Sequence, residues 1–121
     1  MRYPGLTLRI VGGGDPAMGP GKAELISRIA TTGSISAAAR EMGMSYRRAW
    51  LLVEAINASF KQPVVITATG GKRGGGATVT GFGRELVAQF RAMEEKASAA
   101  IADDIAQFTG QLRAQTRRRK T

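Results

Sequence analysis

Apolar and polar positions at the start of the chain predict a strand, a loop and a helix in that order. Leucine and isoleucine alternate with other residues over 6–11, which is typical of a half-buried strand. Glycines and prolines crowd residues 12–21, which predicts an irregular loop. Over 22–31 the apolar residues fall on one helical face, and Gly33 ends this helix because glycine readily adopts the left-handed conformation found at helix ends.

The next two predicted helices are separated by a tight turn, as in a helix-turn-helix. The first begins after an N-cap at Ser34 or Ser36 and runs to Glu41, and Gly43 occupies the left-handed position of the turn. Ser45 caps the second helix. Two helices cross at a steep angle where their contact residues are small or apolar. The residues at the predicted crossing are Ala38, Ala39, Met42, Met44, Ala49, Leu52 and Ile56.

Two β-branched runs in the second half of the chain predict a hairpin. Residues 64–67 and 77–79 read as paired strands, joined by the glycine-dense loop over 69–76. A hairpin that directly follows a helix-turn-helix is a wing. Thr80 then caps a final helix, which is predicted to run continuously to Leu112.

This final helix carries an apolar seam with spacings of three and four residues. A continuous helix over 80–112 would be about 50 Å long, more than a small winged domain can cover, so the seam predicts contact with a second copy of the chain. The alternative is two shorter helices folded back on their own domain. The seam residues are Leu86, Phe90, Met93, Ala97, Ile101, Ile105, Phe108 and Leu112.

These elements predict an α+β fold that is mostly α. It comprises a winged helix-turn-helix DNA-binding domain over 1–79, a long C-terminal dimerisation helix over 80–112, and a basic disordered tail over 113–121.

The face of the second helix opposite its packing residues predicts the DNA-binding surface. The N-terminal part of such a helix enters the major groove, where Arg47 can pair with a guanine edge and Tyr46 can reach a base or a phosphate. Arg48 is better placed for the DNA backbone. Trp50 either packs on the neighbouring helix or contacts DNA, and the alternative for the two arginines is a solvated helix face. The residues predicted to bind DNA are Ser34 and Ser36 at the start of the first helix, and Ser45, Tyr46, Arg47, Arg48 and Trp50 in the second, with Leu51 and Glu54 on the same outward face of the second helix.

Lys72 and Arg73 occupy the tip of the predicted wing and are further candidates for DNA contact. Glycines bring backbone amides close to phosphates, and the two cations neutralise them. A nucleotide-binding loop is excluded, because no stretch fits the pattern G-x-x-x-x-G-K-[ST] and the loop joins two strands. A solvated hairpin tip without a partner is the alternative. The basic run over 117–120 either adds nonspecific affinity for phosphates or acts as a solubilising tail.

Charge and composition favour a nucleic-acid partner. Eighteen Lys and Arg residues against nine Asp and Glu give a net charge of +9, which indicates a polyanionic partner, either nucleic acid or an anionic membrane. No run approaches the roughly 20 apolar residues of a membrane span, and no signal-peptide pattern opens the chain, so we expect a cytoplasmic protein without a membrane partner. Histidine and cysteine are absent, and the acidic pairs at 94–95 and 103–104 are expected to be solvated. We therefore expect no enzyme, metal site or cofactor.

The predicted helix-turn-helix, the wing and the start of the final helix resemble the N-terminal DNA-binding domain of the ModE-type molybdate-responsive transcriptional regulators. That domain is related to the LysR-type winged helices. The matching strings are TGSISAAA at 32–39, MSYRRAW at 44–50, ATGGKRGGGA at 68–77 and TGFG at 80–83. The resemblance implies a dimer, held partly through the long helix, that binds an inverted-repeat operator and represses molybdate-uptake genes when the oxyanion is bound.

In that family molybdate binds a C-terminal pair of small β-barrel domains, and 121 residues leave no room for such a pair. We therefore expect either a stand-alone DNA-binding protein without a small-molecule effector such as molybdate or tungstate, or one that senses a ligand at a site the sequence does not reveal.

Three classes of function remain after this reading. The leading one is a sequence-specific regulator, a repressor of molybdenum-related or other anion-transport genes, whose dimer places two recognition helices about 34 Å apart on a palindromic operator. The second is an architectural, nucleoid-associated protein with little sequence preference, which the charge also fits. The third is a protein-interaction module, against which Arg47, Arg48, Lys72 and Arg73 argue. Replacing Arg47 by alanine separates the first two, because it relaxes base preference in a specific binder and only weakens binding in a nonspecific one.

Overall fold

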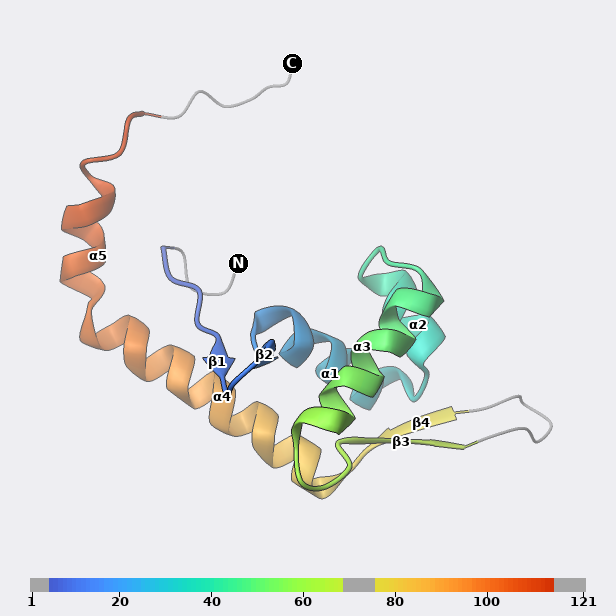
Figure 1. Cartoon of the computed structure of the whole chain (residues 1–121). Coiled ribbons are helices and arrows are strands. Elements are labelled where there is room, and N and C mark those ends of the chain that lie inside the picture. The colour runs from blue at the N-terminus through green and yellow to red at the C-terminus, as the bar shows by residue number, and fades with distance from the viewer. Residues whose placement is uncertain (1–4, 69–75, 115–121) are drawn as a thin grey trace, which may run out of the picture.

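The computed structural model describes residues 5–68 and 76–114, and Figure 1 shows how their elements are arranged. In chain order the elements are β1 (Ile10–Val11), β2 (Pro16–Met18), α1 (Pro20–Thr32), α2 (Ile35–Glu41), α3 (Tyr46–Ser59), β3 (Val65–Ala68), β4 (Gly76–Val79), α4 (Gly81–Ala100) and α5 (Ala102–Thr109). The two strand pairs are small and antiparallel, and helices make up most of the described chain. The predicted fold class, an α+β winged helix that is mostly α, is confirmed.

The N-terminal segment differs from its prediction. The strand expected over 6–11 is restricted to β1, and the stretch expected as a loop contributes its partner, β2, as well as the first residues of α1. Ile10 pairs with Met18, whose side chain is only 3% exposed and anchors the hairpin in the core. The prediction of a loop over 12–21 is wrong because glycines at the tip allow the chain to reverse, after which Pro20 suits the first turn of a helix.

The helix-turn-helix consists of α2 and α3, which pack on each other and on α1. Ala38, Ala39 and Ala49 are at most 2% exposed, so the two helices meet without bulky side chains between them. Gly43 has a φ of 71° in the turn, as its predicted left-handed role requires. The amide of Met44 donates to the carbonyl oxygen of Ala39 at 3.0 Å and closes the turn.

Serine caps fix where α2 and α3 begin. The Ser34 hydroxyl accepts a hydrogen bond from the amide of Ala37 at 3.0 Å, so Ser34 rather than Ser36 is the N-cap of α2. Ser45 accepts from the amide of Arg48 at 3.1 Å, and α3 begins directly after it. Each cap satisfies an amide that has no partner within its helix.

The wing is the β3–β4 hairpin, which projects from the body of the molecule (Figure 1). Its strands pair in register from Val65 opposite Val79 to Ala68 opposite Gly76. The prediction of two paired strands here is confirmed.

The base of the wing is tied to the helix-turn-helix by a residue that the sequence analysis missed. Asn57 on α3 accepts hydrogen bonds from the amides of Val64 and Val65 at 2.8 and 3.1 Å through Oδ1, and its Nδ2 donates to the carbonyl oxygen of Val65 at 2.9 Å. The amide of Ala77 donates to the carbonyl oxygen of Gly33 at 3.0 Å. The wing strands therefore have a fixed position relative to α3.

The prediction of one continuous helix over 80–112 is wrong. The helix breaks at Ile101, with a φ of −119° and a ψ of 24°, and Figure 1 shows α5 bent away from the axis of α4. Asp103 and Asp104 lie in the first turn of α5. Carboxylates are favourable at the positive N-terminal end of a helix, so they stabilise a new helix start at this point. The alternative prediction is correct in that the segment forms two shorter helices, α4 and α5.

An ion network joins α1, α2 and α4. Arg28 pairs with Glu24 at 2.8 Å and with Glu41 at 3.0 Å, while Arg91 pairs with Glu24 at 3.3 Å and with Glu94 at 3.2 Å. The hydrogen bond to Glu41, followed by the one to Glu24, raises the pKa of Arg28 above its ordinary value. Since Arg28 is exposed to solvent, the network orients the helices more than it stabilises them. Glu94 is only 5% exposed, so the expectation that it is solvated is wrong.

Candidate nucleic-acid interface

The N-terminal half of α3 exposes the side chains predicted to bind DNA. Tyr46 is 55% exposed, Trp50 38% and Leu51 46%, and Arg47 and Arg48 are exposed beside them. The buried residues of the helix are Ala49, Val53 and Ile56. The outward face is therefore where the sequence placed it, and its contact with DNA stays a prediction.

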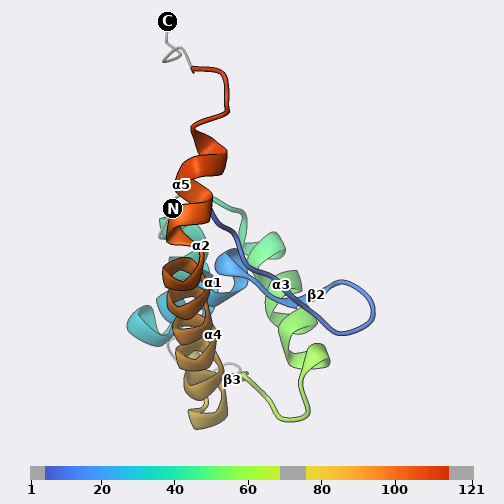
Figure 2. The same ribbon diagram turned by 90° about the vertical axis from the view of Figure 1, so that its left-hand side faces the viewer.

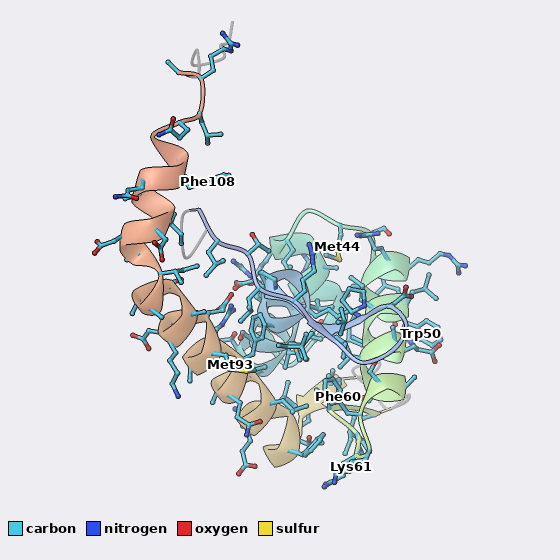
Figure 3. The ribbon with its side chains drawn as sticks, turned by 60° about the vertical axis from the view of Figure 1, so that its left-hand side comes forward. Met44, Trp50, Phe60, Lys61, Met93 and Phe108 are labelled. Carbon is cyan, nitrogen blue, oxygen red and sulfur yellow. The ribbon has the colours of Figure 1, made fainter. Side chains whose placement is uncertain are left out.

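Trp50 lies on the opposite side of the molecule from Met93 and Phe108, which belong to α4 and α5 (Figure 3). The first of these surfaces carries the exposed Arg47 and Arg48, and the second carries exposed apolar side chains among charged ones. A ligand on the outer face of α3 would therefore leave the α4–α5 side free for another partner.

A shallow hollow of about 290 Å³ lies beside the start of α3. It is lined by Ser45, Arg47, Arg48, Leu51 and Leu52. Cationic donors and aliphatic groups thus meet in one recess, a combination that suits the edge of a base pair, where hydrogen-bond acceptors and a thymine methyl group lie side by side.

Ser34 and Ser36 have different environments at the start of α2. Ser34 is half-buried and its oxygen accepts the capping hydrogen bond, so it has a structural role whether or not it touches DNA. Ser36 is exposed in the first turn of α2 and is the more accessible of the two predicted contacts.

Lys72 and Arg73, at the predicted tip of the wing, lie outside the described residues, as does the basic run over 117–120. The structure places the strands that lead to that tip: β3 and β4 extend away from the body on the same side as α2 and α3 (Figure 1). The contribution of the two cations to DNA binding stays a prediction.

The predicted dimerisation seam divides into a buried part and an exposed part. Phe90 is 1% exposed, so its assignment to a second copy of the chain is corrected, and the half-buried Leu86 packs partly against the same core. Phe90 belongs to the core of its own chain because α4 packs on α1. The remaining seam residues are Met93, 41% exposed, Ile101, 38%, Phe108, 73%, Leu112, 62%, and the half-buried Ala97 and Ile105.

The N-terminal segment covers part of this remaining seam. A β-carbon placed on Gly5 would lie 2.7 Å from Cγ2 of Ile105, so the backbone of Gly5 rests directly on α5. In Figure 2 the start of the described chain runs beside α5 in the same way. Ile105 is thereby half-covered without a second chain.

The described part of the chain was also compared with the requirements of a metal site and of a membrane span. Over these residues, no three metal-ligating side chains gather in one place. Within the same ranges, no helix combines the length and apolarity that crossing a membrane requires.

A helix-turn-helix whose second helix presents its first turns outward, followed directly by a hairpin, defines the winged helix-turn-helix class of DNA-binding domain. Comparison with known proteins narrows this class, although no family model matches the chain. The molybdenum-pterin-binding protein MopB of Rhodobacter capsulatus is 51% identical over 77 residues, which are 64% of this chain and 28% of that protein.

Two further relatives carry the name ModE. The DNA-binding transcriptional dual regulator ModE of Escherichia coli (strain K12) is 36% identical over 88 residues, 70% of this chain and 34% of that protein. The molybdenum transport protein ModE of Azotobacter vinelandii is 34% identical over 85 residues, 70% of this chain and 32% of that protein. The chain thus spans about a third of the length of the curated relatives it matches. The resemblance to ModE-type regulators is confirmed, and the chain carries a ModE-like domain. The names of these relatives describe a regulator, a transport protein and a molybdenum-binding protein, and none of the three names an enzyme.

Proposed function

We propose that the protein is a transcriptional regulator, not an enzyme, that binds specific sequences of double-stranded DNA in the cytoplasm. The observation that carries this proposal is the orientation of α3. Its caps and its alanine-lined contact with α2 hold Tyr46, Arg47 and Trp50 outward, at the end of the helix that enters a major groove. The wing lies where it can contact the flanking backbone. The relatives named ModE, one of them a DNA-binding regulator, support the same assignment.

The protein acts as a homodimer on a palindromic operator. The exposed part of the seam, with Met93, Ile101 and Phe108, forms the apolar contact between the two chains. Because this surface faces away from α3, two chains can associate there while each presents a recognition helix to the duplex. Symmetric half-sites would then lie about 34 Å apart along one face of the DNA.

Occupation of the operator represses genes for molybdenum-related or other anion transport. The relatives named molybdenum transport protein ModE and molybdenum-pterin-binding protein MopB support this choice of genes. Molybdate or tungstate acts on the complex only if a site for the oxyanion exists, so operator binding is to be measured with and without each anion.

The second candidate is an architectural protein that coats DNA with little sequence preference. The net charge of +9 favours it, because neutralising phosphates gives affinity that is independent of sequence. A regulator and an architectural protein differ in what Arg47 does.

The test is selection of duplexes from a random pool by the full chain, followed by affinity measurements on the selected duplex and on a scrambled duplex of the same length. We expect a symmetric consensus. The Arg47→Ala substitution should reduce discrimination between the preferred base and other bases at one position by about tenfold. This agrees with the roughly 1–3 kcal/mol that a bidentate contact contributes.

Lys96→Ala is the matched control, since Lys96 is an exposed cation on α4. It should leave discrimination unchanged. A pool that yields no consensus, together with equal weakening of both duplexes by Arg47→Ala, would establish the architectural protein instead.

A further inference from the structure

A second recess adjoins the outer face of α3 and is bounded by four separate segments of the chain. It lies between the β1–β2 hairpin, the first turn of α1, the α2–α3 turn and α3 itself, and it has a volume of about 250 Å³. We call it the cation pocket. The residues that matter here are Arg9, Lys22 and Arg48, which are cationic, with Gly19, Met44 and Leu52 in its walls.

The cation pocket is strongly positive. Three cationic side chains from three segments line it, and its described lining includes no carboxylate. Among the ion pairs of the described residues, none involves Arg9, Lys22 or Arg48. The first turn of α1 carries no acidic residue and has no side-chain cap, so the positive end of that helix is not neutralised from within. A compact anion would therefore find several donors here and no repelling charge.

Two of the cations have defined contacts with the walls of the pocket. The side chain of Arg9 lies along Gly19, where an added β-carbon would be 3.4 Å from Arg9 Cγ and 3.9 Å from Nε. Lys22 is half-buried and its Nζ donates to the carbonyl oxygen of Pro16 at 2.7 Å, which leaves its other two protons available. The hydrogen bond orders the Lys22 side chain in advance, which reduces the entropy that binding would otherwise lose.

The position of the pocket indicates which anion it receives. Arg48 and Leu52 line both the cation pocket and the hollow beside Arg47, so the two recesses adjoin each other at these residues. Met44, in the turn that leads into α3, forms another wall and lies near the start of that helix (Figure 3). A duplex seated on the N-terminal half of α3 would bring its backbone to this edge, because phosphates border the major groove on both sides.

We propose that the cation pocket binds one backbone phosphate of the duplex, beside the groove that α3 enters, through Arg9, Lys22 and Arg48. This extends the DNA-binding surface to the N-terminal hairpin and to α1, outside the helix-turn-helix and the wing. The pocket carries no base information and sets the register of the protein on the duplex. The inference rests on the proposed DNA binding. The experiments therefore distinguish failure of the pocket assignment from failure of DNA binding itself.

The test compares two variants that each remove two positive charges. Arg9→Gln with Lys22→Gln empties the pocket of two cations, whereas Lys61→Gln with Lys96→Gln removes two exposed cations that do not line it. For the first variant we expect the slope of log K against log salt to fall by about 1, as for one lost phosphate contact, and affinity at about 150 mM salt to fall about fivefold on selected and scrambled duplexes alike. The control should keep the native slope. The single substitution Arg9→Gln is a further control, because Lys22 also supports the β1–β2 hairpin through its hydrogen bond to Pro16. Thermal unfolding checks that each variant is folded.

A second measurement locates the phosphate. Methylphosphonates, which are uncharged, replace the phosphates of the selected duplex one at a time. We expect one position at which the replacement weakens binding by the native chain but not by the Arg9→Gln, Lys22→Gln variant. A native salt slope in that variant, or equal sensitivity of both proteins at every position, would overturn the proposal.

The outcomes also separate this inference from the proposed function. If the native chain binds duplexes and Arg47→Ala relaxes base preference while the pocket variant behaves like its control, the pocket assignment alone fails. If the native chain does not bind duplexes, both fail. A free oxyanion is tested by titrating inorganic phosphate at constant ionic strength while following the amide resonances of Gly21 and Lys22. Saturation at millimolar phosphate, without any methylphosphonate effect, would assign the pocket to a free anion and reject the duplex phosphate.

Discussion

Two regions of this molecule use apolar residues at helical spacing, and they use them differently. In α3 the inner positions are small or aliphatic, and Ala49 and Ile56 are fully buried against neighbouring helices, so the opposite face is free to carry function. In α4 and α5 the spacing is just as regular, but Phe90 is buried within its own chain whereas Phe108 is 73% exposed. A periodic apolar pattern therefore identifies one face of a helix, and the packing of the surrounding elements decides whether that face is buried within its own chain.

The contrast between Phe90 and Phe108 offers the largest measurable effect. Phe90→Ala should lower the free energy of unfolding by about 4 kcal/mol, because it removes a fully buried aromatic ring and leaves a cavity. Phe108→Ala should change the stability of the isolated chain by less than about 0.5 kcal/mol, as for other surface substitutions. Denaturant unfolding at several protein concentrations measures both.

The same pair of variants examines the proposed dimer. If the exposed seam joins two chains, Phe108→Ala should weaken self-association in sedimentation equilibrium, and the unfolding midpoint of the native chain should rise with its concentration. Equal losses of stability from Phe90→Ala and Phe108→Ala in the monomer would contradict the division of the seam.

The place where α4 packs on the base of the wing offers a change in stability of intermediate size. At Gly83, near the start of α4, an added β-carbon would lie 2.7 Å from the carbonyl oxygen of Val64 and 3.0 Å from Cγ1 of Val79. Gly83→Ala should therefore force α4 away from the wing and lower the free energy of unfolding by about 2 kcal/mol, as overpacking does. Gly81→Ala is the matched control, because nothing lies within 4 Å of its β-carbon. We expect it to raise stability by up to about 1 kcal/mol, since alanine restricts the unfolded chain. Thermal and denaturant unfolding would contradict this account if the two variants behaved alike.

The helix-turn-helix could be predicted from the sequence because its determinants are local. A serine before each helix, Gly43 in the turn and alanines at the crossing each have one physical role, and their positions fix the inner and outer faces of α3 without knowledge of the rest of the fold. The wing strands followed from their β-branched residues. For the N-cap of α2 the sequence leaves two candidates, Ser34 and Ser36, and the hydrogen bond from the Ala37 amide identifies Ser34.

What the sequence could not provide depends on contacts between distant segments. Asn57 resembles any polar residue near a helix end, and its three hydrogen bonds to the base of β3 become visible only when α3 and the wing are placed together. The break at Ile101 contains neither glycine nor proline, so periodicity continued through it. The cation pocket likewise joins Arg9 to Arg48, which are far apart in the chain.

The smallest expected effect concerns the two serines at the start of α2, which the sequence could not tell apart. Ser34→Ala should lower the free energy of unfolding by about 1 kcal/mol, because it removes the acceptor for the Ala37 amide. Ser36→Ala should leave the stability within about 0.5 kcal/mol, since Ser36 is exposed and caps nothing. As a predicted DNA contact, Ser36 should instead affect affinity: its loss should weaken binding about threefold on selected and scrambled duplexes alike, in the range of one neutral hydrogen bond. Unchanged affinity of Ser36→Ala would remove Ser36 from the interface, and equal loss of stability in both variants would contradict the assignment of the cap to Ser34. Because the two residues are chemically identical and lie in the same turn, any difference between their variants must come from the position that the fold gives each hydroxyl.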